Sequence, residues 1–181
     1  MGFSDDIKRV YDTFKQLNPA EMEAMQDVVS ANPRNALVLK EAKDEATYWA
    51  RILAGTFMEG LPENEAKARF KASIHNGPAD AARHCYWSAL LASKLSYNEA
   101  MRVVFTHEDE QISSSDAKQR MEARMDLHND RVGLEIGTRM KGAGDLDLRE
   151  AVMKALLHGQ LVFLDERSLT LVPTRSLQPS M

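Results

Sequence analysis

Cysteine, long hydrophobic runs and an excess of positive charge are all missing from this 181-residue sequence. The one cysteine, Cys85, excludes an internal disulfide and a zinc site built from cysteines. No apolar run is long enough to span a bilayer, and the first residues, Met1 to Val10, lack the apolar stretch of a signal peptide. We therefore expect a protein without a membrane-spanning segment, made in the cytoplasm without a signal peptide, and either retained there or exported by a secretion machine.

Basic patches and several familiar catalytic patterns are missing as well. The net charge is −4, and Lys and Arg are interspersed with Asp and Glu, which is not typical of a nucleic-acid-binding protein. The sequence has no G-x-S-x-G serine motif, no H-E-x-x-H zinc motif and no glycine-rich phosphate loop. We expect no nucleic-acid partner, and a metal-dependent nuclease stays open only if the metal offsets the acidic balance.

Helical periodicity runs through most of the chain. Asn18 with Glu21 and Ser96 with Glu99 have the spacing of capping boxes, which mark the first residues of helices. Strand signals are confined to residues 160–173, where two short apolar segments flank a polar turn. The sequence therefore predicts a mainly α protein, a compact multi-helix bundle with a short C-terminal β-hairpin.

No composition shift or linker divides the chain, so we expect a single domain over residues 1–181. Its expected parts are N-terminal helices over 1–65, a helical core with the polar motifs over 76–140, and the hairpin over 160–173. Four finer expectations are a helix over Asp5–Leu17, a loop over Gln111–Asp116, a helix capped by Asp147, and fraying from Pro173 onward.

The first polar motif lies on a helix that is otherwise apolar. Asp80, Arg83, His84 and Trp87 are spaced i, i+3, i+4 and i+7, which places them on one helix face. An aspartate four residues before a histidine can orient the imidazole and raise its basicity. The alternative is that Asp80 neutralises Arg83 while His84 occupies a fully hydrogen-bonded core position.

The second motif, His107-Glu108, lies near the end of another predicted helix. Neighbouring residues on a helix point about 100° apart, so both side chains can line a site only if the site lies between their directions. The alternative is a solvated acidic helix end.

The third motif places helix-disfavouring residues in the middle of a long helix. Asp126, Asn129, Asp130 and Gly133 are spaced i, i+3, i+4 and i+7, with His128 beside them. Gly133 costs about 1 kcal/mol relative to alanine in a helix interior, which predicts a compensating close helix crossing there and polar partners for Asp126 and Asn129. An exposed polar stripe is the alternative, and it remains open for Asp130 in particular.

Together the three motifs place imidazole and carboxylate groups on three successive helices, and we expect them to converge in one cluster. The predicted catalytic residues are His84, His107, Glu108 and Asp126. The predicted substrate-binding or orienting residues are Asp80, Arg83, Trp87, His128 and Asn129.

Imidazole with carboxylate suits general acid–base hydrolysis. A buried glutamate could act as the acid in glycoside cleavage, and Glu108 is the candidate. His84, His107 and Asp126 could instead bind a divalent metal, although no familiar zinc spacing supports this. We expect Cys85 to be a small buried side chain without a chemical role.

In order and spacing, these motifs follow the pattern D-x-x-R-H-x-x-W, H-E and M-D-x-H-N-[ND]-x-x-G between Asn76 and Gly137. The chain here resembles a poorly characterised helical domain of bacteria. That domain occurs in secreted or toxin-like chains, including candidate effectors of contact-dependent systems such as type VI secretion. The likeness covers about a third of the chain.

The resemblance implies an antibacterial effector or toxin-type hydrolase, and a cell-envelope component, peptidoglycan or lipid, is the substrate we expect. A cognate immunity protein would then be a partner. No cofactor is implied with certainty, and a divalent metal stays open. The alternative function is a non-catalytic interaction module whose polar cluster is a buried structural network.

Overall fold

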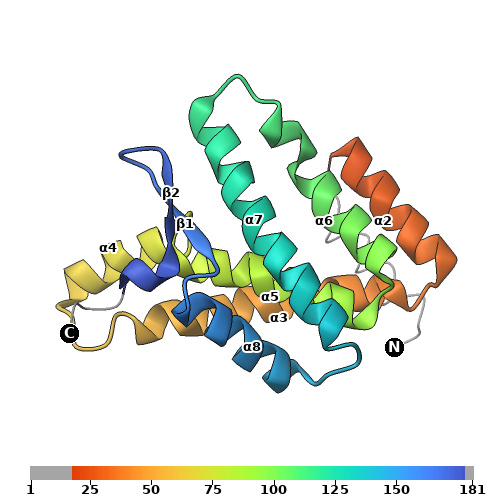
Figure 1. Ribbon diagram of the computed structural model, residues 1–181, viewed down its shortest axis with the longest axis horizontal. Helices are drawn as coiled ribbons and strands as arrows, with labels where there is room; N and C mark the ends of the chain where they lie inside the picture. The colour runs from red at the N-terminus through yellow and green to blue at the C-terminus, as the bar shows by residue number, and fades with distance from the viewer. Residues whose placement is uncertain (1–17, 178–181) are drawn as a thin grey trace.

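Helix α5, Pro78–Lys94, lies at the centre of the fold because small and apolar side chains cover nearly all of its faces. Helices α3, Asn35–Thr56, and α7, Ala117–Arg139, pack along it, and α8, Asp145–Leu157, contacts it as well. Figure 1 shows α7 crossing over α5 while α3 runs beside α5. The computed structural model describes residues 18–177, with the side chains of residues 107–110 outside that description.

Two further helices cover the side of α7. Helix α6, Tyr97–Ile112, lies beside α7, and α2, Pro19–Ala31, lies beside α6 (Figure 1). Both begin with the predicted capping boxes: the Asn18 side chain accepts from the backbone N–H of Glu21, and Ser96 does the same for Glu99. These two helix starts are confirmed.

Helices α5 and α7 approach each other so closely that their backbones nearly touch. A Cβ atom placed on Gly133 would overlap with the backbone carbonyl of Cys85, and one on Gly137 would overlap with that of Ala89. The close crossing predicted at Gly133 is therefore confirmed. It brings the polar side chains of α7 within reach of α5.

One hydrophobic core cluster extends from Val28 in α2 to Leu161 just before the hairpin, with Tyr86 of α5 fully buried inside it. The Tyr86 ring meets the ring of Trp49 edge-on, with 5.0 Å between the centroids. Cys85 is fully buried in the same core, as expected.

The C-terminal part is a small β-hairpin. Strand β1, Val162–Asp165, pairs antiparallel with β2, Thr170–Pro173, and β1 contacts α7 and α5. The remaining helix, α4, Glu63–Ser73, contacts α3 and α5. The prediction of a mainly α fold with a short C-terminal β-hairpin is confirmed. No helix in residues 18–177 is long and apolar enough to cross a membrane.

Three finer expectations need correction. Helix α8 begins two residues before Asp147, with Gly144 as its N-cap, so Asp147 lies in the first turn, where its charge favours the helix dipole. Helix α6 continues through Ile112 into the predicted loop. The residues after Pro173 form a 3₁₀ helix, Thr174–Leu177, and the Thr174 hydroxyl donates to the Leu156 carbonyl. The helix expected over Asp5–Leu17 lies outside the described residues.

Candidate active site

Asp80 is held in place at the first turn of α5. One carboxylate oxygen, Oδ2, accepts the backbone N–H of Asn76 at 2.7 Å. The other, Oδ1, accepts from Nε and Nη2 of Arg83 at 2.9 and 2.6 Å. Asn76 adopts a left-handed backbone conformation, with φ of 60°, which asparagine tolerates better than most residues. The turn before α5 thus fixes a buried carboxylate beside a guanidinium.

His84 lies one turn further along α5 and is only 3% exposed. Its Nε2 is 2.7 Å from Nη2 of Arg83. Because a guanidinium can only donate, Nε2 must be the acceptor, and the ring proton of the neutral imidazole must be on Nδ1. Burial lowers the pKa of His84 and Arg83 lowers it further, against the raising effect of Asp126 and Asp80. The neutral form of His84 is therefore favoured.

Helix α7 places one carboxylate near each imidazole nitrogen of His84. Oδ1 of Asp126 is 3.3 Å from Nε2, and Oδ2 of Asp130 is 3.6 Å from Nδ1. Asp130 is fully buried, and its Oδ1 lies 3.1 Å from the Ser88 hydroxyl, which also donates to the His84 carbonyl at 2.6 Å. We name this group, Asp80, Arg83, His84, Asp126 and Asp130, the His84 cluster.

The structure brings together four of the predicted site residues. Asp80, Arg83, His84 and Asp126 all belong to the His84 cluster, and Trp87 is half-buried on the same side of α5. The predicted convergence is thus observed for two of the three helices. The other two predicted catalytic residues, His107 and Glu108, lie on α6, where their side chains are outside the described part of the chain.

His128 and Asn129 lie on another side of α7 and contact the C-terminal segment instead. The Asn129 amide donates to the Val162 carbonyl at 2.9 Å and accepts the Val162 N–H at 3.0 Å. His128 is exposed, and its Nε2 is 2.9 Å from the Gln160 carbonyl oxygen. These contacts anchor the hairpin to α7, so neither side chain belongs to the His84 cluster.

For Asp130 the sequence leaves an exposed polar stripe open. The structure instead buries Asp130 fully, against Ser88 and His84. The signal that could have found it is its spacing. Asp130 lies four residues after Asp126 and three before Gly133, so a close crossing at Gly133 turns Asp130 toward α5 as well.

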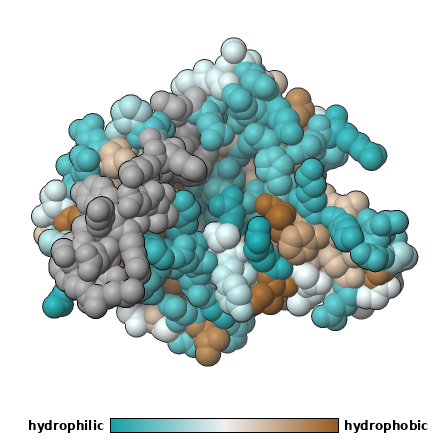
Figure 2. All heavy atoms as spheres, turned by 180° about the vertical axis from the view of Figure 1, so that it is seen from behind, coloured by the Kyte–Doolittle hydropathy of each residue, from teal (hydrophilic) through white to brown (hydrophobic). Residues whose placement is uncertain are grey.

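A cleft opens beside the His84 cluster between helices α2, α3, α5 and α6. Its volume, including space open to solvent, is about 700 Å³. Arg83, His84 and Trp87 line it from α5, Lys43 from α3, and apolar side chains supply most of the remaining wall. Figure 2 shows the back of the molecule as mainly hydrophilic, with scattered hydrophobic residues, outside the part covered by grey atoms. His84 thus lies at the wall of a cleft that is open to solvent.

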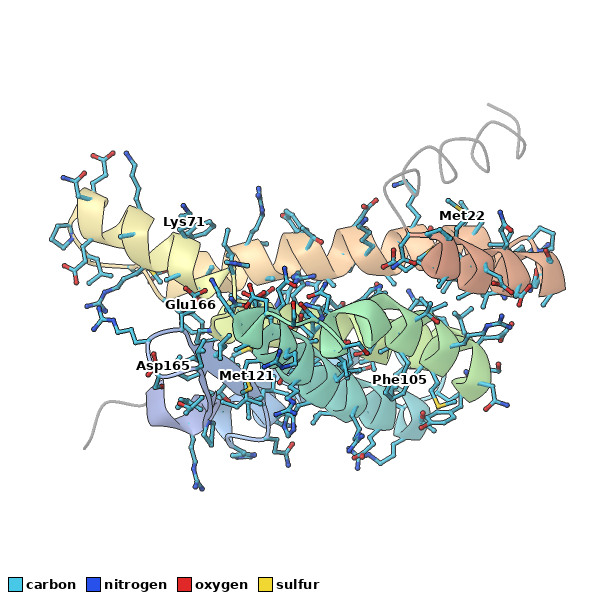
Figure 3. All side chains as sticks on the ribbon, turned by 90° about the horizontal axis from the view of Figure 1, so that it is seen from above. Met22, Lys71, Phe105, Met121, Asp165 and Glu166 are labelled. Atoms are coloured by element: carbon cyan, nitrogen blue, oxygen red, sulfur yellow. The ribbon has the colours of Figure 1, made fainter. Side chains whose placement is uncertain are left out.

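The described residues include two groups that could hold a metal ion. In one, Asp80, His84 and Asp126 offer ligand atoms within 4.8 Å of one another. In the other, the three are His75, Glu122 and Glu166, again within 4.8 Å. Figure 3 shows Glu166 on the side of the hairpin that faces α4. The first group is almost entirely buried, whereas the second is largely exposed.

Comparison with known proteins gives one match. Among the curated proteins and the solved structures, none matches the chain significantly. Residues 27–160 match a family described as "Domain of unknown function (DUF6973)". The matched range contains the whole His84 cluster and α3 to α8. Because it covers more than half of the chain, the protein belongs to the DUF6973 domain family.

Proposed function

We propose that this chain is a toxin-type or effector-type hydrolase that cleaves an ester or amide bond in a cell-envelope component, peptidoglycan or lipid. The observation that carries the proposal is the environment of His84. Its imidazole is 3% exposed, lies at the wall of a cleft, and has a carboxylate within 3.6 Å of each nitrogen, while burial lowers its pKa. Buried imidazole–carboxylate groups beside a cleft are typical of sites that activate water.

In the proposed reaction, Arg83 first turns from Nε2 of His84 toward the substrate carbonyl oxygen. The freed Nε2 and the Asp126 carboxylate then orient a water molecule. The water oxygen adds to the carbonyl carbon, and one water proton passes to Asp126, which is 15% exposed. Asp126 then gives this proton to the leaving oxygen or nitrogen as its bond to the carbon breaks. Arg83 stabilises the negative charge that develops on the carbonyl oxygen.

Asp130 acts through His84 in this proposal and is a positioning residue. It faces Nδ1 at 3.6 Å, so its negative charge favours the ring proton on Nδ1 and leaves the lone pair on Nε2. His107 and Glu108 stay predicted catalytic residues, and the proposed steps do not depend on them.

The envelope substrate is supported by two observations. The motifs of the His84 cluster resemble those of toxin-like chains, and the adjoining cleft combines an apolar wall with charged side chains of both signs, Glu21, Lys43 and Arg83. Such a lining suits a substrate that has an apolar part and a polar or charged group. A cognate immunity protein would inhibit most directly by covering this cleft.

Expression in a bacterial host tests the proposal. We expect growth inhibition when the chain is directed to the periplasm and none when it stays in the cytoplasm. Asp126→Asn and His84→Gln should abolish inhibition while circular dichroism shows folded protein. His128→Gln, which changes an exposed histidine on the same helix as Asp126, is the matched control and should inhibit like the wild type.

Purified protein should also release fragments from isolated peptidoglycan or fatty acids from phospholipid vesicles, and the product identifies the substrate. The proposal is wrong if neither substrate yields a product, or if both cluster variants retain full activity.

A second candidate is a non-catalytic module in which the His84 cluster is a structural network. The observation in its favour is that Arg83 already links Asp80 and His84 by hydrogen bonds. On this alternative, Asp126→Asn lowers the melting temperature and changes nothing else. A normal melting temperature together with a lost activity would exclude it.

A further inference from the structure

The geometry of the His84 cluster resembles a metal-binding site in which the cation is replaced by an arginine. The first observation is spacing. The ligand atoms of Asp80, His84 and Asp126 lie within 4.8 Å of one another. Two ligands of one ion at about 2.1 Å can be up to about 4.2 Å apart. The 3.3 Å between Nε2 of His84 and Oδ1 of Asp126 lies within that limit.

The second observation is the tautomer of His84. Its Nε2 lone pair accepts from Arg83 and lies 3.3 Å from Asp126, while the proton on Nδ1 points toward Asp130. Histidines that ligate a metal through one nitrogen generally donate the other ring N–H to a carboxylate, which fixes the ring. Asp130 faces Nδ1 from the position of that carboxylate, at 3.6 Å.

The third observation is electrostatic. Nε2 of His84 and Oδ1 of Asp126 both carry lone pairs and are only 3.3 Å apart, so they repel each other unless positive charge lies nearby. Arg83 supplies it, because its Nη2 contacts both Asp80 and His84. The Arg83 side chain is 36% exposed on a flexible stem, so it can swing away.

We infer that Asp80, His84 and Asp126 bind one first-row divalent cation in exchange for the Arg83 guanidinium. Imidazole suits zinc and carboxylates suit manganese, so these two ions fit the one-nitrogen, two-oxygen ligand set best. The inference deepens the proposed function and rests on it for the role of the ion, because a bound cation activates water. Binding itself can be measured without turnover.

The other candidate group, His75, Glu122 and Glu166, lacks these features. Lys118 already lies 3.1 Å from Glu166 and 3.7 Å from Glu122, and the Asn76 amide donates to both carboxylates. Its negative charge is thus partly neutralised at the surface. The group serves as a control for weak surface binding.

Isothermal titration of the full chain, without a polyhistidine tag and after treatment with a chelator, tests the inference. We expect the wild type to bind one equivalent of zinc or manganese, and calcium far more weakly. Asp126→Asn should weaken binding at least tenfold, and Asp130→Asn should weaken it about 10- to 100-fold through the orientation of His84. His75→Ala and His128→Gln should bind like the wild type.

Arg83→Gln gives the most specific signature. Removing the internal cation should tighten binding, whereas every ligand variant should weaken it. A cation held elsewhere on the surface would not respond to Arg83 in this way. A misfolded variant would lose affinity, whereas Arg83→Gln is expected to gain it. The Arg83 side chain is also 36% exposed, so its replacement disturbs the core little.

The inference is overturned if neither zinc nor manganese binds at millimolar concentrations, if Asp126→Asn binds as tightly as the wild type, or if Arg83→Gln does not tighten binding. It can fail independently of the proposed hydrolase. Tight one-site binding without hydrolysis would support the metal site and contradict the proposed hydrolase. Hydrolysis by a protein that binds neither zinc nor manganese would support the hydrolase and contradict the metal site.

Discussion

Helix α7 presents buried polar side chains on two sides. The two sides differ in whether their polar atoms have hydrogen-bond partners. Toward the hairpin, Asn129 exchanges two hydrogen bonds with the backbone of Val162, at 2.9 and 3.0 Å. Toward α5, the Nδ1 of His84 is 3.6 Å from Asp130, beyond normal hydrogen-bond distance, and it has no hydrogen-bond partner among the described residues.

The difference indicates what each side does. A matched pair such as Asn129 with Val162 fixes the position of a strand and leaves no capacity for a ligand. A buried imidazole with an unmatched nitrogen costs stability and is typical of a functional site. The predictions below disturb the two sides separately.

The largest effect is expected from moving α7 away from α5. In Gly133→Ala the new Cβ would overlap with the Cys85 carbonyl, so the backbones must separate. We expect a loss of about 3 kcal/mol or more in the free energy of unfolding, despite the gain of about 1 kcal/mol in helix propensity. Urea unfolding measures it. Gly55→Ala in α3 is the matched control, because nothing lies within 4 Å of its Cβ position and it should not destabilise.

A smaller loss is expected from breaking the hairpin side. Asn129→Ala removes both bonds to Val162 and leaves two partly buried backbone groups without these partners. We expect the free energy of unfolding to fall by about 2–4 kcal/mol. Metal affinity and activity per folded molecule should stay unchanged, since the hydrogen bonds of the Asn129 side chain go to Val162. A selective loss of activity in a stable Asn129→Ala protein would contradict the division between the two sides.

The smallest and most specific effect is the pH dependence of the His84 side. In metal-free protein, burial lowers the folded-state pKa of His84 below the ordinary value of 6.5. The unfolded chain then binds a proton more readily than the folded chain as the pH falls below about 6.5. The free energy of unfolding is therefore highest above that pH. It decreases as the pH falls, until the pH is below the folded-state pKa of His84.

Arg83, Asp80, Asp126 and Asp130 are the charged groups that face this imidazole among the described residues. Urea unfolding between neutral and mildly acidic pH should show a steeper decline for the wild type than for His84→Gln. Equal declines would show that His84 does not resist protonation in the folded state.

The sequence predicted the fold and part of the site because both depend on local patterns. Capping boxes at Asn18 and Ser96 and the helical spacing of Asp80, Arg83 and His84 are read directly from neighbouring residues. The structural role of Asn129 could not be predicted from neighbouring residues. Its partner Val162 is 33 residues away, in a hairpin whose position depends on tertiary packing. The burial of Asp130 could be predicted from the sequence, since Asp130 lies on the same helix face as Gly133, where the close crossing with α5 is expected.

Cys85 adds a practical consequence of the tight α5–α7 contact. Its thiol is fully buried, and burial raises its pKa well above the usual range, with a further contribution from Asp130. Its backbone carbonyl is the group that leaves no room for a side chain at Gly133. An alkylating reagent can reach this sulfur only when the two helices part. The alkylation rate of the Cys85 thiol therefore measures how often α5 and α7 separate, without an engineered label.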